Sequence, residues 1–382
     1  MGTLTSLMSL ASNALQAEQA ALNVTSNNVA NQNTIGYTRE IVNFQSVDSV
    51  SISGTSTGQG VSTGTGATSV RDRILEQRVQ QQTQVEAQSS AVASALTSVQ
   101  SVFQLSATAT SAAATTLGTA IDSFYNSFTA LAADPSSTAT RQSVLSAASA
   151  LTSAFNAAST QLASTSSSLN SEVTASVGQI NSLTANIATL NQQISATSPT
   201  GDAGVLEDQR QASIAQLSQL IGLDQVSTEQ NGITLTTSSG AVLVSGSSSF
   251  PLQASQVAGV TQVAAGPDAV DVTATITGGS LGGILQARGQ LATFSSDLDN
   301  LAYAVGTQVN TQNAAGLNAS GTAGAALFTL GTTAAGAAST IALATSNPAS
   351  IAAAAVGEGT APRSPPPSPA APESLHHHSP PA

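Results

Sequence analysis

Three consecutive histidines, His376 to His378, are the first residues in this sequence whose types could do chemistry. Imidazole is a common metal ligand, but a metal site needs ligands that converge from a fixed scaffold. The histidines lie in a proline-rich stretch that offers no such scaffold. The pattern therefore favours an incidental run over a metal site, and because the chain has no cysteine, thiolate sites and cysteine nucleophiles are excluded.

A second candidate is the glycine cluster Gly278, Gly279, Gly282 and Gly283, which could cradle a phosphate. Its spacing fits neither the P-loop nor the dinucleotide pattern, and no lysine follows it. A turn that leads from strand to helix is the favoured interpretation.

The third candidate is a pair of acids, Glu207 and Asp208, beside Arg210. They could act as a catalytic carboxylate pair, or they could interact with the positive end of a helix dipole. We favour the dipole, because acid and base catalysis needs a pocket and long thin helices seldom form one. The sequence thus predicts no catalytic residue, no cofactor and no metal, and hence no enzyme.

The charge balance excludes further classes of function. The net charge is -12, only 7% of residues are charged, and the basic residues are eight arginines with no lysine. Such a chain cannot neutralise a run of phosphates, so it does not bind nucleic acid. It also lacks an apolar stretch of about 18 residues, so we expect no membrane insertion.

The elements that must position any functional residue begin with an amphipathic N-terminal helix, which is followed by an Asn-rich turn. One face carries apolar residues at heptad spacing and is expected to contact other subunits: Leu4, Met8, Ala11, Leu15, Leu22 and Val29. A further apolar row, Leu10, Ala17 and Val24, points elsewhere. A lone helix would leave these rows in water, so we expect it to become ordered on assembly.

The rest of the sequence predicts a mainly α fold, in which long helices form a coiled-coil-like rod domain with a small β insertion. Apolar residues recur every three or four positions in the long helices and alternate with polar ones in the insertion. The expected division is 1–45 N-terminal helix and turn, 46–70 loop or weak hairpin, 71–222 helical rod, 223–277 β insertion, 278–313 returning helix, 314–356 loose Ala/Gly-rich segment, and 357–382 disordered Pro-rich tail.

The N-terminal region resembles the axial proteins of the bacterial flagellum, which share a helix, an Asn-rich stretch and a Gly-aromatic turn. The residues that carry the resemblance are Ser26, Asn27, Asn28, Ala30, Asn31, Asn33, Thr34, Gly36, Tyr37 and Arg39. Segments 179–195, 205–222 and 278–313 narrow it to the hook-associated protein 1 family, and the likeness extends from about residue 4 to about residue 355.

The resemblance implies a structural subunit at the hook–filament junction that is needed for filament assembly. Its implied partners are copies of itself in a ring, the hook protein, the second junction protein and an export chaperone. The implied location is outside the cell in the flagellum. The chain would be exported without a cleavable signal peptide, since Met1 to Val24 has neither the charged start nor the apolar block of one.

Two departures from the family pattern stand out. Ile35 occupies a position where proline is usual, and the chain ends in a Pro-rich tail where the family has a long helix that pairs with the N-terminal one. We hypothesise that the sequence from about Gly357 is read out of frame. Translation of the coding DNA in the other two frames tests this, because an apolar heptad pattern should resume in one of them.

Two other classes of protein stay open alongside the junction subunit. Another axial protein, such as the hook or distal rod protein, would share residues 4–39 but not the long central helices. A secreted coiled-coil surface protein would account for the Ser/Thr-rich composition but not for the Asn-rich turn.

Overall fold

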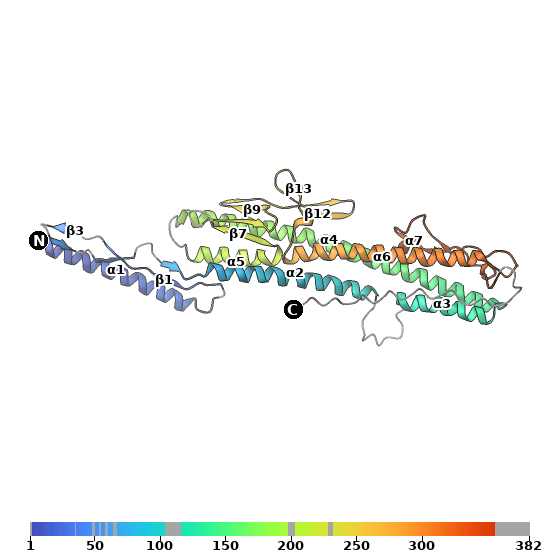
Figure 1. Cartoon of the computed structure of the whole chain (residues 1–382). Helices are drawn as coiled ribbons and strands as arrows, with labels where there is room; N and C mark the ends of the chain where they lie inside the picture. The colour runs from blue at the N-terminus through green and yellow to red at the C-terminus, as the bar shows by residue number, and fades with distance from the viewer. Residues whose placement is uncertain are drawn as a thin grey trace, which may run out of the picture. The chain divides into compact units, whose positions relative to one another are not determined.

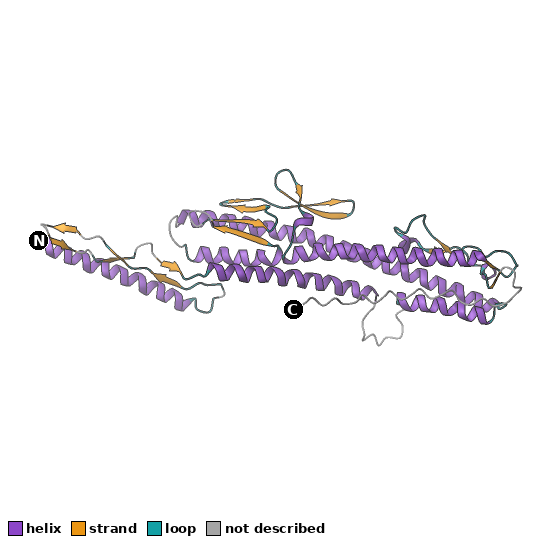
Figure 2. Cartoon of the chain, viewed as in Figure 1, coloured by secondary structure: helices purple, strands orange, loops and turns teal. Residues whose placement is uncertain are grey.

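The chain is mainly α-helical, with long helices, small sheets and an N-terminal helix, which confirms the predicted fold class (Figure 1 and Figure 2). A computed structural model describes residues 2–34, 36–47, 50–52, 55–57, 60–63, 67–103, 116–197, 203–227 and 232–355. The helices within them are α1 (Gly2–Ala30), α2 (Arg73–Phe103), α3 (Leu117–Ala133), α4 (Thr138–Thr197), α5 (Val205–Leu220), α6 (Gly279–Ala315) and the short α7 (Ala337–Thr340).

The fold divides into two compact units. The first unit comprises Met1–Ala95 and Ser168–Arg288, and the second comprises Leu96–Ser167 and Gly289–Ala382. Helices α2, α4 and α6 contribute residues to both. The finer division into domains expected from the sequence stays a prediction.

The segment that follows α1 in the first unit is a long β-hairpin. Its strands are β1 (Glu40–Val42), β2 (Gln45–Ser46), β3 (Val50–Ile52), β4 (Thr55–Thr57), β5 (Val61–Ser62) and β6 (Ala67–Ser69). They pair antiparallel from the outside inwards, β1 with β6, β2 with β5 and β3 with β4. Of the loop and the hairpin that the composition allowed, the structure has the hairpin.

The β insertion of the first unit consists of two small sheets. The four-stranded sheet has the order β10-β9-β8-β7, with β7 (Leu223–Ser227), β8 (Ile233–Thr237), β9 (Val242–Ser245) and β10 (Ser248–Ser249). The three-stranded sheet has the order β11-β12-β13, with β11 (Gln253–Val257), β12 (Val260–Ala265) and β13 (Val270–Asp271). In β8 the buried and half-buried residues alternate, as a strand with one face on a core requires.

Three asparagines of α4 hold the insertion to the helices. Asn181 exchanges two hydrogen bonds of 2.8 Å with the backbone of Leu252. Asn170 donates to the Gly259 carbonyl at 3.1 Å and accepts from the Thr261 amide at 3.1 Å. Asn191 donates to the carbonyls of Ile233 and Gly246 at 3.0 and 2.9 Å. Each amide side chain can donate and accept, so it can pair with extended backbone as another strand would.

Gly278 and Gly279 form the predicted turn that ends the insertion and begins α6, whereas Gly282 and Gly283 lie within α6. A short 3₁₀ turn at Thr273–Thr275 precedes it. Gly278 and Gly279 have φ angles of 72° and 63°, which favour glycine. A Cβ on Gly279 would lie 2.3 Å from the Ile221 nitrogen, so only glycine lets the turn pack this closely against the end of α5.

The second unit has an aromatic core. Phe124 of α3, Phe155 of α4 and Phe328 of the C-terminal segment are fully buried, and the rings of Phe124 and Phe328 lie 5.6 Å apart. Thr116 caps α3 by accepting the Thr119 amide at 3.0 Å. Helix α3 ends at Ala133 and α4 begins at Thr138, so Pro135 lies between the two helices, where its ring cannot interrupt either of them.

The Ala/Gly-rich segment after α6 is folded, which corrects the expectation that it is loose. It forms β14 (Gly316–Leu317), β15 (Phe328–Thr329), α7, β16 (Ala342–Leu343), a 3₁₀ turn at Pro348–Ser350, and β17 (Ala354–Ala355). Asn310 of α6 accepts the amides of Leu327 and Phe328, both at 2.8 Å. The expectation failed because asparagine side chains of α6 hold this segment through its backbone. Such contacts do not require an apolar repeat in the segment, so its own sequence shows no periodic pattern.

Several predictions concern residues outside those that the structure describes: Ile35, the three histidines and the rest of the tail from residue 357. Within the described residues, no helix is long and apolar enough to cross a membrane. In the same ranges, no group of His, Cys, Asp and Glu side chains is arranged to hold a metal ion.

Candidate functional site

The predicted contact row on α1 is exposed along the whole helix. The exposed fractions are 67% for Leu4, 69% for Met8, 71% for Leu15, 69% for Leu22 and 61% for Val29. Ala11, on the same face, is exposed as well. Scattered apolar residues on a surface are ordinary, but a continuous row of large ones is typical of an interaction site. We call Leu4, Met8, Ala11, Leu15, Leu22 and Val29 the contact row.

The other apolar row of α1 lies under the hairpin. Ala17 is only 4% exposed, and Leu10 and Val24 are less exposed than any large residue of the contact row. A Cβ on Gly60, beside β5, would lie 2.7 Å from a methyl carbon of Leu10, so the glycine allows the hairpin to approach the helix closely. The chain thus covers this apolar row of α1 in part, with Leu10 still 37% exposed, and leaves the contact row open.

The Asn-rich turn is organised by Asn28. Its amide donates to the Glu40 carbonyl at 2.8 Å and its oxygen accepts the Glu40 amide at 2.9 Å. The same oxygen accepts the Tyr37 hydroxyl at 2.9 Å. Burial, and then the charges of Glu40 and Asp208, raise the pKa of the Tyr37 phenol, which favours the protonated form that donates this bond. One helical side chain therefore fixes the start of β1 against the end of α1.

The other residues of the predicted turn motif take different positions. Asn31 donates to the Asn27 carbonyl at 3.1 Å, and Gly36 has a φ angle of 85°, where glycine is favoured. The side chains of four motif residues are exposed: Ser26, Asn27, Asn33 and Arg39. The structure thus brings Asn28 and Tyr37 together with Glu40, which the motif did not include.

A second polar contact lies at the base of this region, and the sequence did not reveal it. Asp208, in the first turn of α5, accepts the Thr38 amide at 3.0 Å and pairs with the Arg71 guanidinium. Arg71 also donates to the Thr38 hydroxyl at 3.0 Å and lies 3.6 Å from a Glu76 carboxylate oxygen. We call Thr38, Arg71, Asp208 and Glu76 the basal joint.

The charged residues at the start of α5 therefore contact different parts of the first unit. Glu207 and Asp208 lie in the first turn, where the helix dipole favours negative charge, as the preferred interpretation of the sequence expected. Asp208 serves the basal joint, whereas Arg210 donates to Asn191 of α4 at 2.9 Å. Asp208 is separated from Arg71 by more than 130 residues in sequence, so local spacing carried no signal of their contact.

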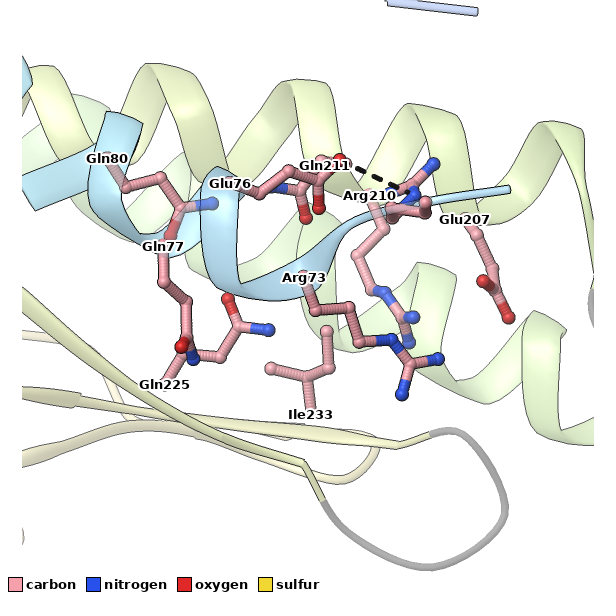
Figure 3. Close-up of a pocket in the computed structure, with 10 residues that line it drawn as sticks. Arg73, Glu76, Gln77, Gln80, Glu207, Arg210, Gln211, Gln225 and Ile233 are labelled. Carbon is pink, nitrogen blue, oxygen red and sulfur yellow. Dashed lines mark ion pairs between the residues drawn. The ribbon is translucent and has the colours of Figure 1, made fainter. Parts of the chain in front are cut away.

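A small cavity lies beside the basal joint (Figure 3). It is lined by polar and charged side chains of α2 and α5, among them Arg73, Glu76 and Arg210, and by Gln225 of β7 and Ile233 of β8. Burial raises the pKa of the Glu76 carboxyl, and the charge of Arg71 opposes that shift. The cavity volume is about 30 Å³, which is room for about two water molecules. Its lining includes Arg71 and Glu76 of the basal joint.

Comparison with known families decides what kind of protein this is. The model of the flagellar hook-associated protein FlgK helical domain matches residues 103–328, which are 226 of the 382 residues. The chain belongs to this family. The matched FlgK domain extends from the end of α2 to β15, and the model of the flagella basal body rod protein family matches residues 8–38, which are α1 and the Asn-rich turn.

Curated FlgK relatives are similar over about half of the chain. The flagellar hook-associated protein 1 of Bacillus subtilis (strain 168) is 31% identical over 194 residues, which are 49% of this chain and 37% of that protein. The protein of the same name from Escherichia coli (strain K12) is 31% identical over 198 residues, which are 52% of this chain and 35% of that protein. The chain therefore spans little more than a third of the length of the curated relatives it matches.

A solved FlgK structure agrees with the fold. The flagellar hook junction protein FlgK from Burkholderia pseudomallei is 25% identical with a TM-score of 0.63, over 72% of this chain and 66% of that one. The resemblance to hook-associated protein 1 is thus confirmed. FlgK proteins are structural components of the bacterial flagellum and not enzymes, which agrees with the function class expected from the sequence.

Proposed function

We propose that this chain is a structural subunit of the bacterial flagellum at the junction of hook and filament, where it is needed for filament assembly. Membership of the FlgK family supports the junction. The observation that carries the proposal is the contact row of α1, whose large side chains are 61–71% exposed, whereas the neighbouring row is buried at Ala17 and only 37% exposed at Leu10. A subunit of a polymer needs such an unpaired surface, whereas an isolated protein gains nothing from it.

Burial of the contact row provides the driving force for assembly. Each of its large side chains is 61–71% exposed, and burying one contributes roughly 1–2 kcal/mol. The five large residues together contribute on the order of 5–10 kcal/mol per copy, which offsets the cost of holding subunits in one arrangement. The surface is nearly uncharged, because Glu18 is the one charged residue between residues 2 and 30. Copies of an acidic chain can therefore meet along α1 with little repulsion.

The proposed partners follow from this surface and from the family. Copies of the chain would form a ring that contacts the hook protein on one side and the second junction protein on the other. The subunit would act outside the cell, after export without a cleavable signal peptide. An export chaperone is a further proposed partner. The turn-motif residues would set the exit of the chain from α1, and the contact row would meet neighbouring subunits.

The match of the rod protein model to residues 8–38 is the observation that favours the second candidate, another flagellar axial protein. A hook or distal rod protein would share that segment. The match of the FlgK helical domain over residues 103–328 favours the junction instead.

Complementation of a deletion strain tests the proposal. The unaltered chain should restore attached filaments, and a variant with Leu15→Gln and Leu22→Gln should secrete flagellin that fails to attach. Val226→Gln with Val270→Gln is the matched control, since these valines are 57% and 61% exposed but lie in β7 and β13. Attached filaments in the α1 variant at the level of the control would contradict the proposal.

A further inference from the structure

The basal joint connects both ends of the hairpin to one helix. Thr38 lies two residues before β1, and Arg71 lies two residues after β6. Both contact Asp208 of α5, and Arg71 also contacts Thr38. The Asp208 carboxylate therefore contacts the chain both just before the hairpin begins and just after it ends.

The joint is charged and mostly withdrawn from water. The side chains of Arg71 and Asp208 are 9% and 14% exposed, respectively. The chain has eight arginines and no lysine, so Arg71 is one of few cationic side chains that it carries. Hydrogen bonds between ionised groups are directional and stronger than those between neutral groups. A buried ion pair is weak evidence for stability alone, whereas it can fix one arrangement among several.

Helix capping alone does not account for Asp208. Glu207 precedes it, and its carboxylate oxygen lies 3.5 Å from the Ala203 amide just before α5 begins, where it can interact with the helix end. The Asp208 carboxylate instead accepts hydrogen bonds from the Thr38 backbone amide and from the guanidinium of Arg71, which lies between β6 and α2. Its contacts serve the N-terminal region rather than its own helix.

We propose that Arg71 and Asp208 are positioning residues that fix the orientation of α1 and the hairpin relative to α5. Loss of the pair leaves α1 and its contact row formed but lets them swing about residues 38 and 71. The last step, that a fixed orientation is needed for assembly, rests on the proposed junction function. The orientation itself does not, because the contacts lie within one chain.

Spin labels measure this orientation directly, because the chain contains no cysteine. Ser12→Cys on α1 and Gln216→Cys on α5 place labels on exposed residues of the two helices. A pulsed dipolar distance distribution in dilute protein should be narrow with the joint intact and clearly broader with Asp208→Asn. Asp224→Asn removes the same charge from an exposed residue and should leave the distribution narrow.

Hydrogen exchange separates a loosened joint from general destabilisation. Asp208→Asn should speed exchange of amides 36–47 and 67–70 by about ten- to a hundredfold, as expected when hydrogen bonds to a charged group weaken. Amides of α6 between residues 289 and 309 should change by less than about twofold. An unchanged distance distribution, or equal acceleration in α6, would overturn the proposal.

The same variants separate the joint from the junction function. If the unaltered chain fails to restore filaments while the distance result holds, the junction function fails and the joint stands. If Asp208→Asn leaves distance and exchange unchanged, the joint fails whatever the filaments show.

Discussion

Replacing Asn28 by alanine should loosen the turn after α1 far more than its size suggests. Asn28 makes three hydrogen bonds of 2.8–2.9 Å, two with the Glu40 backbone and one with the Tyr37 hydroxyl. A hydrogen bond contributes about 1 kcal/mol net, so the loss of three costs roughly 2–3 kcal/mol of local stability. The region is only partly buried, so water can replace part of each lost hydrogen bond. The expected loss of stability therefore does not exceed about 3 kcal/mol.

Amide exchange of residues 36–47, followed by mass spectrometry, measures this change. A loss of roughly 2–3 kcal/mol corresponds to exchange that is faster by about 30- to 150-fold. Tyr37→Phe removes one of the three bonds and should accelerate exchange by about fivefold. Asn33→Ala is the matched control, since Asn33 belongs to the same motif but is exposed.

We expect exchange of residues 36–47 to be fastest in Asn28→Ala, intermediate in Tyr37→Phe and unchanged in Asn33→Ala. This expectation would be refuted if Asn28→Ala changed exchange by less than about threefold, or if Asn33→Ala had an equal effect. Either result would mean that the turn is held by its backbone conformation and not by the Asn28 side chain.

Three further predictions concern the rest of the fold. Asn170→Ala should raise exchange of amides 257–263 by about tenfold or more in a hydrogen-exchange experiment, because it releases the tip of the β11–β12 hairpin. Ala258→Gly should raise stability in thermal melts by about 0.5–1 kcal/mol, because Ala258 has a φ angle of 51°. Arg141→Met should lower the free energy of unfolding in urea by about 3 kcal/mol, because it removes the donor to the buried Ile351 carbonyl and to the half-buried Pro135 carbonyl.

Much of the helical fold could be predicted because its signals are local. Apolar residues at spacings of three and four marked the helices. The segment after α6 was mispredicted for the opposite reason. Its fold depends on Asn310 and Asn313, which lie on α6 and bind its backbone. A side chain that pairs with distant backbone leaves no periodic pattern in the segment it holds.

The basal joint is a second contact that the sequence could not predict. Asp208 looked like a helix-terminal acid, which it is, and nothing near it in sequence pointed to Arg71. Two charges that meet across more than 130 residues are informative only once the fold is known. A sequence this poor in charge does offer one indirect signal, since each arginine that it retains needs a physical reason.

The exposed face of the N-terminal helix follows partly from its sequence and partly from the hairpin that packs against it. The heptad spacing reveals two apolar rows, but it cannot tell which row the chain itself will cover. That choice depends on the hairpin, whose small residues allow close approach, as Gly60 does at Leu10. Large side chains in the hairpin would hold it away from α1 and expose both rows. A chain with both rows open would associate less selectively, because either face could bind a neighbour. The hairpin therefore reduces the exposure of one apolar row of α1 more than that of the other, and segment 46–70 helps to decide which face is available for assembly.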